Sequence, residues 1–150
     1  MAFQASLVFL DASVLVAASR SPTGGSAVAL EVGQGKRYRA ALSTVVLLEA
    51  RVNIADKFGE TELLRFYRQL AALDPLMTGQ PTKEQLDLCT PLTGEKDAHV
   101  LAAALACDAE YLLTLDRRHL LTPAVDAAGL PVTVMTPGEF LRGVASSDSS

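Results

Sequence analysis

Four acidic residues are the strongest candidates for chemistry in this sequence: Asp11, Glu49, Asp97 and Asp116. Asp11 and Asp116 each follow an apolar run that is typical of a strand buried in a parallel sheet. Asp97 opens an alanine-rich segment with helical spacing, and Glu49 lies on the face of a predicted helix that we expect to pack inward. Because ligands bind beyond the carboxyl ends of the strands in such sheets, the four acids can converge at one functional edge.

Each acid also has a simpler interpretation. Asp11 and Asp97 could be helix N-caps, since an aspartate at that position accepts hydrogen bonds from free backbone N–H groups. Asp116 could be a turn residue or the cap of a short helix. Glu49 is harder to explain, because we expect it to share the inward face of its helix with Val45, Val46, Val52 and Asn53. A buried carboxylate costs free energy unless it is paired or bound to a metal.

Four neighbouring carboxylates would favour a divalent metal ion. Their mutual repulsion raises their pKa values until a cation neutralises them. Mg²⁺ or Mn²⁺ fits an all-oxygen site and retains water molecules, which suits the hydrolysis of a phosphodiester bond. Ser13 and Thr114 each lie two residues from one of these acids, where a hydroxyl could orient a carboxylate or a metal-bound water. Structural roles fit both hydroxyls equally well.

The chemistry must be positioned by an α/β domain. Strands that alternate with helices predict a mostly parallel sheet with right-handed crossovers. We expect one domain over residues 1–145 and a disordered tail over residues 146–150. The predicted strands cover residues 7–10, 39–42, 110–115 and 132–135. The predicted helices cover residues 27–32, 45–57, 60–73, 97–109 and a short helix that starts at Thr82 and ends near Pro91, together with a terminal helix after the capping box at 136–139.

Charge and cysteine content limit the functions that remain. The net charge of −4 argues against a broadly basic nucleic-acid surface, so any such contact would rest on a few arginines: Arg37, Arg39, Arg117 and Arg118. Cys89 and Cys107 match no metal-ligand spacing and suggest a reducing compartment. The first 18 residues lack the basic start of a signal peptide, and no apolar run is long enough for a membrane span. We therefore expect a cytoplasmic protein without a membrane segment, in which residues 1–18 form a buried strand and its exit.

Four segments together resemble the PIN-domain ribonucleases, most closely the VapC-type toxins of toxin–antitoxin systems. They occur in the family's motif order and cover nearly the whole chain: FLDASVLVAA, LLEARV, GEKDAHVLAAALACDAEYLLTLDRRHL and VMTPGEFL. The segment from Asp97 to Asp116 is the most specific of them. The resemblance implies a PIN-like three-layer α/β/α sandwich on a mostly parallel, five-stranded sheet.

The same resemblance implies a Mg²⁺- or Mn²⁺-dependent endoribonuclease that acts on RNA, forms homodimers and is blocked by a cognate antitoxin. It assigns catalytic and metal-binding roles to Asp11, Glu49, Asp97 and Asp116. Ser13 and Thr114 would be the accompanying hydroxyls. Arg117 and Arg118 are weaker candidates for substrate binding.

The chain departs from the family's pattern after Asp116. Many members place a further acid there, whereas this chain continues with Arg117, Arg118 and His119. The departure puts a second metal ion in doubt. We expect His119 to be a surface or packing residue, with contact to a phosphate or a metal as the alternative, and we assign His99 to structure.

Two other functions compete with a nuclease. A non-catalytic PIN-like module for RNA processing or protein interaction would keep the fold, although such a module need not maintain four repelling carboxylates. A phosphatase that forms an aspartyl-phosphate fits less well, because residues 11–13 lack a second acid. The helix over residues 60–73 carries Leu63, Phe66, Tyr67 and Leu70 on one side, either for the core or for a partner helix.

Overall fold

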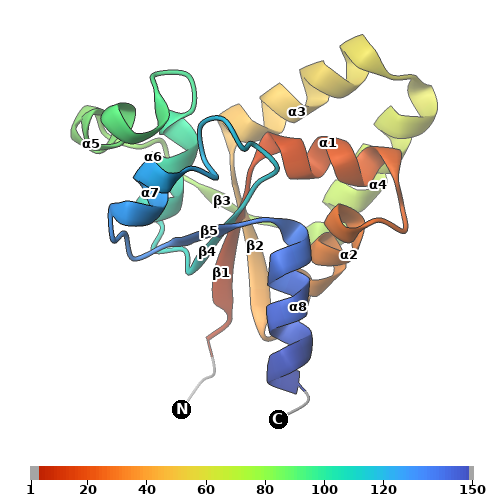
Figure 1. Ribbon diagram of the computed structural model, residues 1–150. Helices are drawn as coiled ribbons and strands as arrows, with labels where there is room; N and C mark the ends of the chain where they lie inside the picture. The colour runs from red at the N-terminus through yellow and green to blue at the C-terminus, as the bar shows by residue number, and fades with distance from the viewer. Residues whose placement is uncertain (1–3, 149–150) are drawn as a thin grey trace.

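Five parallel strands form the sheet in the order β3-β2-β1-β4-β5 (Figure 1). The computed structural model describes residues 4–148. The strands are β1 (Ser6–Leu10), β2 (Tyr38–Ser43), β3 (Leu76–Thr78), β4 (Tyr111–Leu113) and β5 (Thr133–Met135). The central strand β1 is covered on both sides, and Phe9 is fully buried. This burial explains why β1 is a continuous apolar run rather than an alternating one.

Eight helices of the described residues cover the two faces of the sheet (Figure 1). One layer contains α1 (Ala12–Arg20), α2 (Gly25–Val32), α3 (Thr44–Lys57), α4 (Glu60–Leu73) and α8 (Pro137–Asp148). The other layer contains α5 (Lys83–Thr93), α6 (Ala98–Ala106) and α7 (Pro123–Ala127). The predicted three-layer α/β/α sandwich on a five-stranded sheet is therefore confirmed, and the sheet is parallel throughout.

Local sequence explains the helices that hold the candidate residues. The Ser43 hydroxyl accepts a hydrogen bond from the backbone N–H of Val46 at 3.2 Å and so caps the start of α3. The run Ala102–Ala104 of α6 is fully buried. Such small side chains allow α6 to lie close to the sheet. The capping box of Thr136 and Glu139 fixes the start of the terminal helix, as predicted.

Three elements were not predicted: α1, α7 and β3. Residues 12–18 were expected only to lead away from the first strand, but they form most of α1. This helix contacts α2, α3 and α4, and Arg20 is its one exposed residue, so its sequence continues the apolar character of β1 and presents no broad polar face. Strand β3 has three residues and depends on pairing with β2, through Ala41 and Leu76 among others. Helix α7 is a single short turn-like segment of five residues.

Several predicted ends differ from the structure. Helix α6 ends at Ala106 rather than at residue 109, and β4 ends at Leu113 rather than at residue 115. Helix α5 continues past Pro91 to Thr93, where we expected it to end near the proline. Its packing against α6 keeps the backbone helical there. Helix α8 continues to Asp148 and so enters residues 146–150, which were expected to form a disordered tail. No glycine or proline follows Gly143 to stop the helix, and residues 149–150 lie outside the described part of the chain.

Helix α3 is rotated relative to the prediction. Val46, Ala50 and Ile54 are fully buried, whereas Val45 and Val52 of the expected inward face are exposed. On α4, Phe66 packs into the core, which was one of the two alternatives for this helix. Tyr67 is exposed and accepts a hydrogen bond from Arg51 Nε at 2.8 Å.

Across residues 4–148, no helix combines the length and the apolar character needed to cross a membrane.

Candidate metal centre

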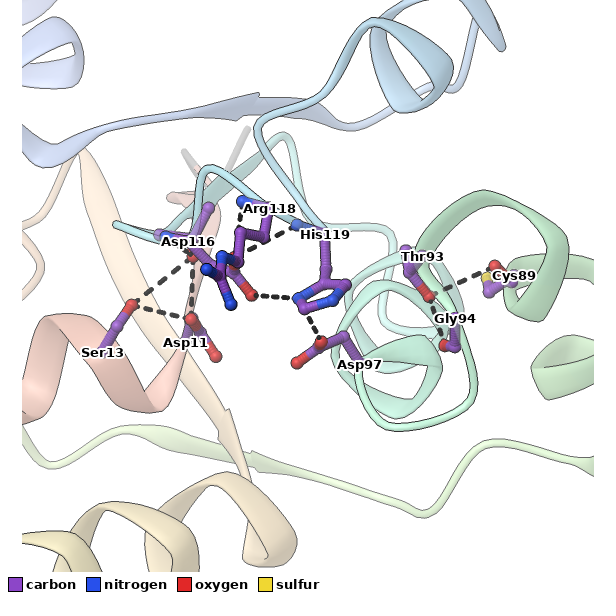
Figure 2. Close-up of polar contacts among 10 residues, drawn as sticks. Asp11, Ser13, Cys89, Thr93, Gly94, Asp97, Asp116, Arg118 and His119 are labelled. Carbon is purple, nitrogen blue, oxygen red and sulfur yellow. Dashed lines mark hydrogen bonds and ion pairs between the residues drawn. The ribbon is translucent and has the colours of Figure 1, made fainter.

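Adjacent strands bring Asp11 and the segment after β4 to the same edge of the sheet. Leu10 of β1 pairs with Leu113 of β4, and the Asp11 N–H donates to the Leu113 carbonyl at 3.0 Å. The two chain segments therefore leave the sheet side by side. Figure 2 shows Asp11 and Asp116 next to each other at this edge, with Asp97 and His119 beside them.

Two hydroxyls hold the Asp11 carboxylate. Ser13 Oγ donates to Asp11 Oδ2 at 2.7 Å, and Thr114 Oγ1 donates to the same oxygen at 2.8 Å (Figure 2). The hydroxyls are themselves held, because Ser13 Oγ accepts from the Leu115 N–H and Thr114 Oγ1 accepts from the Asp116 N–H, each at 3.0 Å. Asp11 is only 7% exposed and Thr114 is fully buried. The network fixes Oδ2 of Asp11, and within residues 4–148 no hydrogen bond reaches Oδ1, which can therefore face a ligand.

Asp97, Asp116 and His119 form a second, more exposed cluster. His119 Nδ1 lies 3.1 Å from Asp97 Oδ2 and 3.3 Å from Asp116 Oδ2 (Figure 2). One donor atom from each of the three residues lies within 4.8 Å of the others. The two carboxylates thus share one imidazole, in contrast to the surface or packing role that we expected for His119.

The cap and turn roles considered for Asp11, Asp97 and Asp116 account for only part of their contacts. Asp11 and Asp97 do stand at the N-caps of α1 and α6, but within residues 4–148 neither carboxylate makes a capping hydrogen bond. The turn interpretation holds for one oxygen of Asp116, since Oδ1 accepts from the N–H groups of Arg118 and His119 at 2.9 and 3.1 Å. Its Oδ2 faces His119 instead.

Glu49 and Asp97 lie in the negative field of the other acids. Partial burial and the charge of Asp11 raise the pKa of Glu49, and Asp97 adds to the effect. Partial burial and the charge of Asp116 raise the pKa of Asp97, and Asp11 adds to that effect. The nearby positive groups oppose these shifts without cancelling them: His99 and Lys96 near Glu49, and His119 and Lys96 near Asp97.

The four predicted acids therefore share one electrostatic environment, but their carboxylates are not equally close. Asp97 and Asp116 belong to the tight group with His119, whereas Asp11 and Glu49 lie outside it. The electrostatic effects of His119, Lys96 and His99 on Glu49 and Asp97 were not predicted. The spacing of three residues between Asp116 and His119 was the available signal, because a turn of that length returns the side chain toward its start.

The donor set fits a divalent cation. It offers carboxylate oxygens and one imidazole nitrogen, and the pKa values of Glu49 and Asp97 are raised, first by partial burial and then by the neighbouring acids. A bound cation would stabilise the ionised form of these carboxylates relative to the protonated form. The residues can thus hold a hard or borderline metal ion.

The two candidate arginines differ in position. Arg117 and Arg118 are both exposed on the loop after Asp116. Arg117 lines a hollow of about 500 Å³ between this loop, α7 and β5, and that hollow contains none of the four acids. The chemistry of the acids, rather than the size of the hollow, identifies the functional edge.

The model of the PIN domain family matches residues 7–118. The chain belongs to the PIN domain family. Proteins of this family are generally nucleases. The matched segment contains Asp11, Glu49, Asp97 and Asp116, and it ends one residue before His119. No curated protein matches the chain by sequence.

Solved structures share the PIN fold of this chain at low sequence identity. VapBC2 from Rickettsia felis, bound to a DNA fragment from its promoter, is 16% identical with a TM-score of 0.60, and the match covers 87% of this chain and 98% of that one. PAE2754 from Pyrobaculum aerophilum is 16% identical with a TM-score of 0.56, covering 82% and 92%. FitAcB from Neisseria gonorrhoeae is 15% identical with a TM-score of 0.56, covering 87% and 97%.

Proposed function

We propose that this PIN-domain protein is a metal-dependent endoribonuclease that hydrolyses phosphodiester bonds in RNA. The observation that carries the proposal is the gathering of carboxylates from four separate segments at the functional edge of the sheet, where partial burial and, after it, repulsion by neighbouring acids raise the pKa of Asp97 and Glu49. A purely structural edge gains nothing from such repulsion. Family membership supports nuclease chemistry at the same positions.

In this proposal Asp11, Glu49, Asp97 and Asp116 bind Mg²⁺ or Mn²⁺ and are the catalytic residues. A bound ion would activate a water molecule and stabilise the charge that develops on the phosphate. Ser13 and Thr114 hold Asp11 in one orientation through the bonds to Oδ2. The exposed Arg117 and Arg118 are placed on the adjacent loop, where they could contact the RNA backbone.

The test is cleavage of a mixed panel of RNA and single-stranded DNA in Mn²⁺, Mg²⁺ or EDTA. We expect metal-dependent cutting of RNA that Asp97→Asn reduces at least about 100-fold, because metal stabilisation is worth several kcal/mol and each 1.36 kcal/mol is a factor of about 10. Asp87→Asn is the matched control, since it makes the same chemical change at an exposed position of α5.

Each outcome of this test has a defined meaning. Equal cutting by the wild type and Asp97→Asn would reject the proposed site. Cutting of DNA alone would reject RNA as the substrate. If neither nucleic acid is cut and calorimetry detects no Mn²⁺ binding, the protein is a non-catalytic PIN module rather than an enzyme.

We also propose that the protein is the toxin of a toxin–antitoxin pair, that it acts in the cytoplasm and that it forms a homodimer. Exposed apolar side chains on adjoining helices support a protein partner: Val45, Leu48 and Val52 on α3 with Leu64 and Tyr67 on α4. The free thiols of Cys89 and Cys107 are compatible with a reducing compartment.

Expression of the wild type should arrest bacterial growth, whereas expression of Asp97→Asn should not. Growth unaffected by an RNA-cutting wild type would reject the toxin role.

A further inference from the structure

The loop that carries His119 is held in place by its own hydrogen bonds. Asp116 Oδ1 accepts from the N–H groups of Arg118 and His119, and the Asp116 carbonyl accepts from the Leu121 N–H at 2.9 Å. Leu120, the next residue after His119, is fully buried and anchors the loop in the core. The His119 ring is thereby directed back toward the acids, although its side chain is 48% exposed.

The distances around His119 Nδ1 match those between ligands of one metal ion. Two ligand atoms at right angles, each about 2.1 Å from an ion, lie about 3.0 Å apart. The Nδ1 atom lies 3.1 Å from Asp97 Oδ2 and 3.3 Å from Asp116 Oδ2. Small side-chain movements are therefore enough for all three atoms to bind one cation.

The other oxygens of the site are compatible with this arrangement. Asp116 Oδ1 is occupied by the loop N–H groups, so its Oδ2 is the oxygen that remains for an ion. Asp97 makes no capping hydrogen bond in the described part of the chain, and its Oδ2 faces the same nitrogen. One oxygen from each acid and one nitrogen from His119 thus point to a common position.

We infer that His119 is a nitrogen ligand of the cation bound by Asp97 and Asp116, and that it shifts the preference of the centre from Mg²⁺ toward Zn²⁺ and other ions that accept imidazole. The inference rests on the proposed metal site. Its physical basis is ligand type, because carboxylate and water suit Mg²⁺, whereas imidazole suits the later first-row metals. The alternative is that His119 only neutralises the two carboxylates as a cation and leaves when a metal ion binds.

Calorimetric titration with Zn²⁺ and Mg²⁺ separates these possibilities in the wild type, His119→Ala and His119→Asp. We expect His119→Ala to weaken Zn²⁺ binding at least about 10-fold, as loss of a group that supports a metal site commonly does, and to change Mg²⁺ binding much less. His119→Asp replaces the nitrogen with an oxygen ligand, so it should retain Mg²⁺ binding while losing the preference for Zn²⁺. Thermal unfolding in EDTA checks that both variants are folded.

A second measurement observes the ligand directly. The chain has two histidines, His99 and His119, so a spectrum of the ¹⁵N-labelled imidazoles contains one reporter and one internal reference. We expect Zn²⁺ to shift the Nδ1 resonance of His119 by much more than that of His99. The His119→Ala variant assigns the signals.

The outcomes distinguish this inference from the proposed function. If the wild type binds neither ion, the proposed metal site itself fails. If the wild type binds Zn²⁺ but His119→Ala binds it equally or more tightly, His119 is only a counter-charge and the inference is overturned. An unchanged His119 Nδ1 resonance in the Zn²⁺-bound wild type would overturn it as well.

Discussion

The two halves of the candidate site are built differently. Asp11 and Thr114 are buried, and hydroxyl and backbone groups hold Asp11 Oδ2 in one position. Asp97 and Asp116 are more exposed, and the only group that joins their carboxylates within residues 4–148 is the His119 imidazole. The first half is part of the core, whereas the second half is a cluster of charges that a cation can reorganise. We therefore expect substitutions in the first half to affect folding and those in the second to affect ion binding.

The largest expected effect on folding comes from Thr114→Val. The change keeps the side-chain shape but removes the donor to Asp11 Oδ2 and the acceptor for the Asp116 N–H. Leaving buried polar groups unpaired costs about 1–3 kcal/mol of unfolding free energy, which urea denaturation measures. Thr93→Val is the matched control, since it removes a buried hydroxyl that bonds only backbone carbonyls. Both variants should lose stability, but only Thr114→Val should also weaken metal binding.

The pH dependence of the metal-free protein gives an intermediate effect. Folding raises the pKa of Asp97 and Glu49, so the folded protein keeps these protons to a higher pH than the unfolded chain does. The resulting stability is present below the ordinary carboxyl pKa of about 4 and is lost as the pH rises through the raised values. Asp97→Asn should reduce this loss.

The measurement is thermal unfolding in EDTA at a series of pH values that starts near the ordinary carboxyl pKa of about 4 and increases from there. The groups that face Asp97 are Asp116, Asp11, His119 and Lys96, and all of them are retained in the variant. Asp87→Asn controls for the change in net charge. Identical pH profiles for the wild type and Asp97→Asn would contradict the prediction.

The smallest expected effect is that of His119→Ala on the stability of the metal-free protein. The His119 side chain is 48% exposed, and exposed ion pairs contribute little in water. We expect a change within about 0.5 kcal/mol in urea denaturation, in contrast to the loss of Zn²⁺ affinity. A stability loss as large as that of Thr114→Val would show that the exposed half is structural after all, and would remove the difference between the two halves.

Much of the fold was determined by local sequence. The apolar run of β1 ends at Asp11, where the strand gives way to α1, and the caps at Ser43 and Thr136 start their helices at the predicted residues. Helix α1 was missed because its residues before Arg20 are buried or half-buried, so the sequence continues the apolar run of β1 and shows no broad polar face. It also could not reveal β3, because three residues form a strand only through pairing with β2.

The candidate site also combines features that follow from local sequence with features that only the tertiary structure decides. The sequence by itself marked the four acids and the two hydroxyls as candidates, since residue type and position next to predicted strands and helices are local properties. Only the tertiary structure decided which groups share an oxygen, which acids lie closest together and that His119 joins Asp97 to Asp116. The physical reason is that distances across the edge of the sheet depend on strand order and loop conformation, and residue spacing along the chain fixes neither.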